Sequence, residues 1–330
     1  MTARAPPLLA VRQLKVQYAL PAAWPWQPPA TLLAVDEINF NLHAGETLGI
    51  VGESGCGKST LARTLIGLQA AASGAVSYGG RNLCGLSQAQ WRPLRREIQM
   101  VFQDPLASLD PRMTIGHSIA EPLLSLCPEI SAAGRETRVL EMMERVGLPR
   151  ELRNRYPHEF SGGQCQRAGI ARALVLRPKI LICDEPVSAL DVSVQAQIIN
   201  LLMQLQREQG LAMIFIAHDL AVVRHISRRV LVMYLGRVME QALCDELFER
   251  PAHPYTKALL ASAPGQSSAA ARAQQLLDGE IPSALNPPPG CAFATRCPMA
   301  DEHCARVAPH FRKLGRGTVV ACHYVAEAIA

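Results

Sequence analysis

The sequence predicts an α/β protein with a parallel sheet covered by helices, and two patterns along the chain indicate it. Short unbroken apolar runs at 47–51, 180–183 and 213–217 end in polar or glycine-rich turns, as strands buried on both faces do. Helical periodicity appears elsewhere, at 60–68, 135–146, 163–176 and 194–208. Strands that alternate with helices in this way are typical of an α/β core.

The composition fits a packed globular protein. The chain has 330 residues, of which 49% are hydrophobic and 18% charged, with a net charge of +5. This mild charge permits contact with phosphates or with a membrane protein, but it gives no reason to expect a nucleic-acid partner. No apolar run approaches the roughly 18–20 residues that span a bilayer, and the N-terminus does not resemble a signal peptide.

Proline marks the expected domain boundaries. Of 24 prolines, six lie at or before Pro29 and nine lie from Pro251 onward, so regular structure is expected mainly at about 30–250. A hairpin at 229–235 and 237–241, turned at Gly236, is expected to close the core. We therefore expect one large domain at 1–250 and a smaller C-terminal extension at 251–330.

A glycine-rich segment follows the first predicted strand and fits the phosphate-loop pattern G-x-x-x-x-G-K-[ST]. Its backbone N–H groups would surround phosphate oxygens at a helix start. Lys58 would reach the β- and γ-phosphates, and the Ser59 hydroxyl would coordinate Mg²⁺. The alternative, a turn that only joins strand to helix, is disfavoured by the complete motif. The expected nucleotide contacts here are Gly52, Ser54, Gly55, Gly57, Lys58, Ser59 and Thr60.

Two carboxylates follow the second predicted strand, at the sheet edge where ligands of open α/β sheets bind. Asp184 is expected to hold Mg²⁺, and Glu185 is expected to polarise the attacking water. Carboxylates at a strand end are often only solvated, but the phosphate loop favours the catalytic interpretation.

The segment from Phe160 to Arg167, with Ser161, Gly162, Gly163 and Gln164, resembles the signature motif of ATP-binding-cassette (ABC) proteins. It would present N–H groups to a phosphate at a helix start. The resemblance implies an ABC nucleotide-binding domain with a RecA-like parallel core, an antiparallel β subdomain and a helical subdomain at about 104–166. In that family this motif contacts the ATP of a partner subunit.

Further residues occur in the order of the ABC family. Gln103 resembles the glutamine of the Q-loop, which senses the γ-phosphate and Mg²⁺. Asp191 resembles the D-loop aspartate at the dimer interface, and His218 resembles the switch histidine that contacts the γ-phosphate. Tyr18 resembles the aromatic residue that stacks on adenine, although a Trp- and Pro-rich insertion containing Trp24 and Trp26 separates it from the phosphate loop, and a core tyrosine is the alternative.

Within the ABC family the chain resembles the ATPases of oligopeptide/dipeptide importers, in particular the F-type subunits of oligopeptide permeases. Stretches at 51–61, 99–115, 156–167 and 216–235 carry the resemblance, with the run from Arg250 to Thr256. It implies ATP-driven oligopeptide uptake with a D-type ATPase as heterodimer partner, two membrane-spanning permease subunits and an extracytoplasmic binding protein. The chain would then lie peripherally on the cytoplasmic face of the membrane.

Four C-terminal cysteines form a separate motif: Cys291, Cys297, Cys304 and Cys322. Their spacing matches neither close zinc pairs nor common ferredoxin runs, so it leaves zinc, a cluster or reduced thiols open. The peptide-importer resemblance implies a [4Fe–4S] cluster of structural role, because small modules often need such a staple. A second expectation concerns Cys56 in the phosphate loop, whose alkylation should inhibit unless ATP protects.

Two other function classes are weighed against the importer. A soluble ABC ATPase acting on nucleic acid or the ribosome is disfavoured by the single compact cassette, and a redox domain with an ATPase switch would give the cysteines the main role. Within the importers, dipeptides, murein peptides, nickel or another small solute are alternative substrates.

Overall fold

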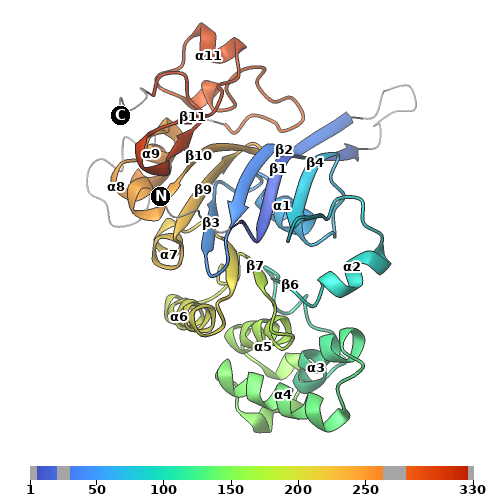
Figure 1. Ribbon diagram of the computed structural model, residues 1–330. Coiled ribbons are helices and arrows are strands. Elements are labelled where there is room, and N and C mark those ends of the chain that lie inside the picture. Colours follow the sequence, from blue (N-terminus) through green and yellow to red (C-terminus); the bar gives the residue numbers. More distant parts are fainter. Residues whose placement is uncertain (1–5, 21–29, 263–279, 326–330) are drawn as a thin grey trace. The chain divides into compact units, whose positions relative to one another are not determined.

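The computed structural model describes residues 6–20, 30–262 and 280–325, which fall into two compact units (Figure 1). Unit 1 contains Leu42–Glu46 and Leu86–Ile216. Unit 2 contains the described parts of Pro6–Asn41, Thr47–Gly85 and Ala217–Ala330. The insertion with Trp24 and Trp26 lies outside the described residues. Within the described ranges, no helix is long and apolar enough to cross a membrane.

Unit 1 contains three parallel strands, β6 (Ile98–Val101), β7 (Ile180–Asp184) and β8 (Ala212–Ile216). β7 lies between the other two, and all its residues, like those of β8, are buried. This explains the unbroken apolar runs, because a strand covered on both faces has no polar side. The two strands predicted here from the sequence are confirmed, each within one residue at either end.

Helices make up the rest of unit 1. α2 (Gln88–Leu94) comes before β6, and α6 (Val192–Gln209) comes before β8. α3 (Ile115–Leu126), α4 (Ala132–Arg145) and α5 (Gly162–Leu174) pack against one another (Figure 1), with the short 3₁₀ turns η1 (Arg150–Asn154) and η2 (Pro157–Glu159) between α4 and α5. α4, α5 and α6 each begin and end within about three residues of the predicted helical stretches.

Unit 2 begins with an antiparallel arrangement. Its four-stranded sheet has the order β2 (Ala30–Leu42), β1 (Leu9–Leu20), β4 (Ser73–Tyr78) and β5 (Arg81–Asn82), and β4 runs antiparallel to both β1 and β5. This is the antiparallel part that the ABC resemblance implied. α1 (Lys58–Leu65) packs against β1.

A second group of strands in unit 2 carries the C-terminal extension. β3 (Thr47–Val51) runs parallel to β9 (Arg229–Tyr234), which forms the predicted hairpin with β10 (Arg237–Leu243). β12 (Val319–Val320) pairs antiparallel with β10, and β11 (Arg312–Lys313) pairs with β12. The end of the chain thus adds strands beside the hairpin. The helical pieces of this part are α7 (Leu220–Ile226), α8 (Cys244–Glu249), α9 (Pro254–Ala261), η3 (Ala294–Arg296), α11 (Glu302–Arg306) and η4 (Gly315–Gly317).

Candidate nucleotide-binding site

The phosphate loop joins β3 to α1, and its shape depends on glycine. Gly57 has φ 101° and is the N-cap of α1. A Cβ atom there would lie 2.2 Å from the Ala34 carbonyl oxygen, and one on Gly52 would lie 2.2 Å from the Met233 carbonyl oxygen. Real Cβ atoms do not approach backbone oxygen so closely, so both positions require glycine. The conformation therefore explains why the motif has glycine at its two fixed positions.

Lys58 is held inside this loop. Its side chain is buried, and its Nζ donates to the carbonyl oxygens of Gly52 at 2.7 Å and Glu53 at 3.0 Å. A buried ammonium group needs such acceptors because its desolvation is costly. The loop thus holds one positive charge among its own carbonyl groups, where the motif predicts a phosphate-binding lysine.

Tyr18 and Thr60, both predicted nucleotide contacts, lie close together. The Tyr18 hydroxyl on β1 is 3.4 Å from Thr60 Oγ1 on α1. Tyr18 is half-buried, so part of its ring faces solvent beside the helix that the phosphate loop begins. This position is compatible with the predicted adenine contact, which stays a prediction.

In unit 1, the structure brings Gln103 and Glu185 together. Gln103 Nε2, two residues after β6, donates to Glu185 Oε2 at 3.1 Å. Asp184 ends β7 and is 2% exposed. β6 and β7 are parallel neighbours, so residues after them emerge at one edge of the sheet. Three predicted site residues therefore gather at the carboxyl end of two adjacent strands.

Glu185 has an unusual backbone. Its φ is 46°, in the left-handed region that residues with a Cβ rarely occupy, and its N–H donates to the Ile216 carbonyl at 3.0 Å. Its own carbonyl accepts a hydrogen bond from Ser188 Oγ at 3.1 Å. Such strain persists only where surrounding contacts enforce it, and it concentrates at functional positions. The Glu185 carboxylate is therefore aimed by a constrained turn.

The signature segment forms the N-terminus of α5. Ser161 is its N-cap: Ser161 Oγ accepts from Gln164 N at 3.3 Å, while Gln164 Oε1 accepts from Ser161 N at 3.0 Å. Ser161 and Gly162 are exposed. A Cβ on Gly163 would lie 2.6 Å from Val194 Cγ1 of α6, so close packing requires glycine there. The helix start is thus rigid and open to solvent, as an anion site at a helix N-terminus must be.

Asp191 and His218 both lie just before helices. Asp191 is the N-cap of α6 and is exposed; the next residue, Val192, is 81% exposed. His218 follows β8 and is exposed, and Asp219 after it caps α7 by accepting from Ala221 N at 2.7 Å.

Sequence reasoning missed three residues that support the phosphate loop. Arg296 Nη1 and Nη2 donate to the Glu53 carboxylate, at 2.8 and 3.0 Å, and Glu53 N donates to the Tyr255 hydroxyl at 3.0 Å. Arg296 and Glu53 are 243 positions apart. The only local signal was the run from Arg250 to Thr256, which the resemblance had singled out without a role.

The Cys56 side chain points into the protein. Cys56 is 4% exposed, and burial raises the pKa of its thiol even though Lys58 lies nearby. A buried thiol with a raised pKa forms little of the reactive thiolate at neutral pH. Alkylation at Cys56 should therefore be slow, and its inhibition of the protein, with protection by ATP, stays a prediction.

The four C-terminal cysteines are free thiols that lie within electrostatic reach of one another. Burial raises the pKa of Cys291 to about 11, and the charges of Cys304, Cys297 and Cys322 add to the rise. Cys291 N donates to the Cys304 carbonyl at 2.8 Å. Even so, among the described residues no three His, Cys, Asp or Glu side chains are arranged to hold a metal ion. The predicted iron–sulfur cluster, and its zinc alternative, find no support in this arrangement.

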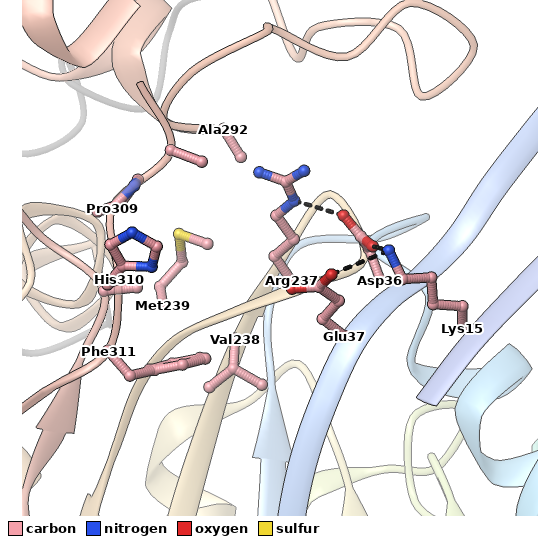
Figure 2. Close-up of a pocket in the computed structure, with 12 residues that line it drawn as sticks. Lys15, Asp36, Glu37, Arg237, Val238, Met239, Ala292, Pro309, His310 and Phe311 are labelled. Carbon is pink, nitrogen blue, oxygen red and sulfur yellow. Dashed lines mark hydrogen bonds and ion pairs between the residues drawn. The ribbon is translucent and has the colours of Figure 1, made fainter. Parts of the chain in front are cut away.

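A separate pocket of about 290 Å³ lies between β1, β2, β10 and the C-terminal extension (Figure 2). Its charged side chains neutralise one another: Asp36 accepts from Lys15 Nζ at 3.1 Å and from Arg237 Nε at 2.8 Å. Lys15 also pairs with Glu37 at 3.0 Å, and these partners raise the pKa of Lys15. With its charges paired, the pocket shows no excess of positive charge that would attract a triphosphate.

The fold and the site define an ATP-binding cassette. Residues 35–188 match the family described as "ABC transporter". The chain resembles the solved cassette MJ0796 bound to ADP and Pi, with a TM-score of 0.65 and 28% identity over 72% of this chain and 98% of that one. A cassette of Clostridium perfringens, cbiO1 of the cbiONQ transporter complex, matches with a TM-score of 0.63 and 30% identity over 74% and 91% of the two chains.

The C-terminal region indicates which family of ABC transporters the chain belongs to. Residues 239–304 match the "Oligopeptide/dipeptide transporter, C-terminal region" family. The oligopeptide transport ATP-binding protein OppF of Salmonella typhimurium is 59% identical over 92% of both chains. The di/tripeptide transport ATP-binding protein DppF of Pseudomonas aeruginosa is 50% identical over 90% of this chain and 92% of that one. The chain belongs to the ATP-binding subunits of the oligopeptide/dipeptide ABC transporter family, and it is an ATPase.

Proposed function

We propose that this chain hydrolyses ATP to energise the uptake of oligopeptides across the cytoplasmic membrane. The observation that carries the proposal is 59% identity, over 92% of the chain, to an oligopeptide transport ATP-binding protein. The match to the transporter-specific C-terminal region supports the same substrate class. The identity to a di/tripeptide subunit is 50%, so dipeptide uptake is the second candidate.

The proposal gives each predicted site residue a role in binding or hydrolysing ATP. Lys58 and the loop N–H groups bind the phosphates, and Tyr18 contacts adenine. Ser59, Gln103 and Asp184 offer hydroxyl, amide and carboxylate oxygens, the ligands that Mg²⁺ prefers, and would hold the ion that withdraws charge from the phosphates. The burial of Asp184 and the bond from Gln103 to the adjacent Glu185 support this donor set.

Glu185 orients and polarises the attacking water, and His218 contacts the γ-phosphate. The bond from Gln103 Nε2 to Glu185 Oε2 and the constrained backbone of Glu185 support its placement. General-base contributions of this kind are typically about 10²–10⁴-fold in rate.

The signature residues Ser161, Gly162, Gly163 and Gln164, with Asp191, face the ATP of a second ATP-binding subunit of the D-type. The solvent-exposed helix start at Ser161 supports an interface there. After Gln103, Leu106 is 53% exposed on a loop that Asp104 orders by accepting from Leu106 N at 2.9 Å. This segment is suited to dock on one of two permease subunits, which place the chain peripherally on the cytoplasmic face. An extracytoplasmic binding protein delivers the peptide.

A cluster on the four cysteines stays a prediction of the resemblance. Iron and acid-labile sulfide in anaerobically purified protein, with broad visible absorption, would support it. Protein without iron, with four alkylatable thiols after unfolding, would agree with the free cysteines of the structure.

The substrate class is tested by uptake of labelled di-, tri- and pentapeptides in cells that lack the native gene and carry a plasmid copy. Restored uptake of tri- and pentapeptides supports the oligopeptide proposal. Restored uptake of dipeptides alone supports the second candidate, and uptake of neither refutes peptide transport.

A further inference from the structure

The C-terminal extension reaches the phosphate loop through one buried ion pair. The Arg296 guanidinium forms two parallel bonds to the Glu53 carboxylate, of 2.8 and 3.0 Å. The Arg296 side chain is 2% exposed and that of Glu53 is 19% exposed. Bidentate pairs of this kind are strong and fix orientation as well as distance. Glu53 is the residue directly after the first glycine of the loop, so the pair acts on the loop itself.

An aromatic cluster holds Arg296 in place. Arg296 Nη1 donates to the Tyr234 hydroxyl at 3.2 Å, and its guanidinium lies 5.7 Å from the Tyr234 ring centroid. Phe293, three residues earlier and fully buried, packs on Tyr234 and Tyr255 with ring centroids 5.4 and 5.3 Å apart. The Tyr255 hydroxyl accepts the Glu53 N–H. Both the backbone and the carboxylate of Glu53 are therefore bound by residues that follow the hairpin.

The same two segments also line a common pocket. A pocket of about 200 Å³ is lined on one side by Glu53, Ser54 and Cys56 and on another by Ile281 and Pro282 of the extension. The extension thus borders the loop at two places. A change in the packing of residues 291–297 would reach the phosphate loop through Arg296.

The charge of Glu53 gives this contact a consequence for nucleotide binding. A carboxylate in a phosphate loop repels the triphosphate, and repulsion across a partly buried site is weakly screened. Arg296 cancels that charge, and its two bonds fix where the carboxylate points. We propose that Arg296 is a positioning residue for ATP binding, which neutralises Glu53 and fixes the start of the phosphate loop. The proposal rests on nucleotide binding by this loop.

The test compares full-length wild-type protein with Arg296→Gln, Glu53→Gln and the double variant. The measurements are the Kd of a fluorescent trinitrophenyl-ATP, KM and kcat for MgATP, and Tm. Arg296→Gln should weaken ATP binding by roughly tenfold, with kcat changed by less than about threefold, because Glu53 is left uncompensated. Glu53→Gln should lower Tm, because it leaves a buried guanidinium without its partner, yet bind ATP at least as tightly as wild type.

The double variant separates charge from structure. If the charge of Glu53 is the cause, the double variant regains ATP affinity to within about threefold of wild type. Arg296→Lys keeps the charge but loses the two parallel bonds of the guanidinium, so its ATP affinity should lie between those of wild type and Arg296→Gln. The matched control is Arg306→Gln, on the same extension. Arg306 forms an exposed 3.2 Å pair with Glu302, and losing this pair should change neither ATP affinity nor Tm.

Two results would overturn the proposal: unchanged ATP affinity in folded Arg296→Gln, or a double variant as weak as Arg296→Gln alone. If Arg296→Gln does not fold, the other two variants still test the proposal. A wild-type KM in Arg296→Lys would contradict it, and so would weaker ATP binding in Glu53→Gln. Failure of wild-type protein to bind ATP would refute the proposed function instead.

Discussion

Glu185 is the residue on which the chemistry depends most. Glu185→Gln keeps the size of the side chain and the possible contact with Gln103, but removes the base. We expect kcat for ATP to fall by about 10²-fold or more, while ATP affinity changes little. Steady-state ATPase assays and nucleotide titration measure both quantities. Glu302→Gln, on an exposed side chain, is the control, and a kcat within threefold of wild type in Glu185→Gln would exclude the catalytic role.

At the same scale, sequence reasoning was strongest where function requires a fixed local pattern. The phosphate loop, Asp184 and Glu185 lie next to strand ends that apolar runs identify; Gln103, which the ABC resemblance indicated, donates to Glu185 in the structure. Arg296 could not be found in this way. Its partner lies 243 positions earlier, and a single arginine has no local signature for such a pair.

At the scale of elements, the start of α1 depends on Gly57. Gly57→Ala places a Cβ 2.2 Å from the Ala34 carbonyl oxygen and also requires a φ of 101°. We expect ATP binding to weaken by at least about tenfold, because the loop must shift to relieve the contact. Gly79→Ala is the control: φ is 55° there, but no atom lies within 4 Å of the new Cβ. It should cost only about 1 kcal/mol of stability and leave ATP binding unchanged; normal binding by Gly57→Ala would contradict this account of the loop.

α9 carries a pH-dependent cap. His253 Nδ1 accepts from Tyr255 N at 3.0 Å, and burial lowers the pKa of His253 to about 4, from about 6.5 when unfolded. Between pH 6.5 and pH 4, His253 is protonated in the unfolded chain but not in the folded one. The contribution of His253 to the free energy of unfolding is therefore fully present above pH 6.5 and is lost as the pH falls towards 4. The loss from this group is roughly 3 kcal/mol.

The test uses His253→Asn, which can still cap the helix but does not titrate. Urea unfolding at pH 7 and pH 4.5 should show a smaller acid loss in this variant than in wild type. The neighbouring Glu240 accepts from His253 N at 2.8 Å, and burial raises the pKa of the Glu240 carboxyl. The effect of Glu240 on stability in acid is opposite to that of His253, and it is the same in wild type and in the variant. Equal acid losses would show that His253 does not titrate as described.

The elements themselves were predictable to different degrees. Buried strands and amphipathic helices of unit 1 follow from local periodicity, so their positions agree within a few residues. The strands β11 and β12 are each two residues long; β12 pairs with β10 about 80 positions away, and β11 pairs with β12, so no periodicity indicates them. The cysteine spacing likewise left zinc, a cluster and reduced thiols open, and among the described residues no three metal-ligating side chains are arranged to hold an ion.

At the scale of the whole molecule, one region of the chain indicates its chemistry and another indicates its transporter family. The cassette defines ATP chemistry, and the C-terminal region, matched at 239–304, identifies the transporter family. The bridge from Arg296 to Glu53 joins them, so the family-specific region contacts the loop that binds phosphate. No pattern in the sequence itself names the transported solute.

The central claim is that ATP hydrolysis by this chain drives oligopeptide uptake. The most direct measurement is uptake of a labelled pentapeptide in deletion cells that carry wild type, Glu185→Gln or Glu302→Gln at equal protein level. Wild type and Glu302→Gln should restore uptake, while Glu185→Gln should leave it near that of cells without the gene. Pentapeptide uptake at the wild-type rate in Glu185→Gln cells would contradict the claim.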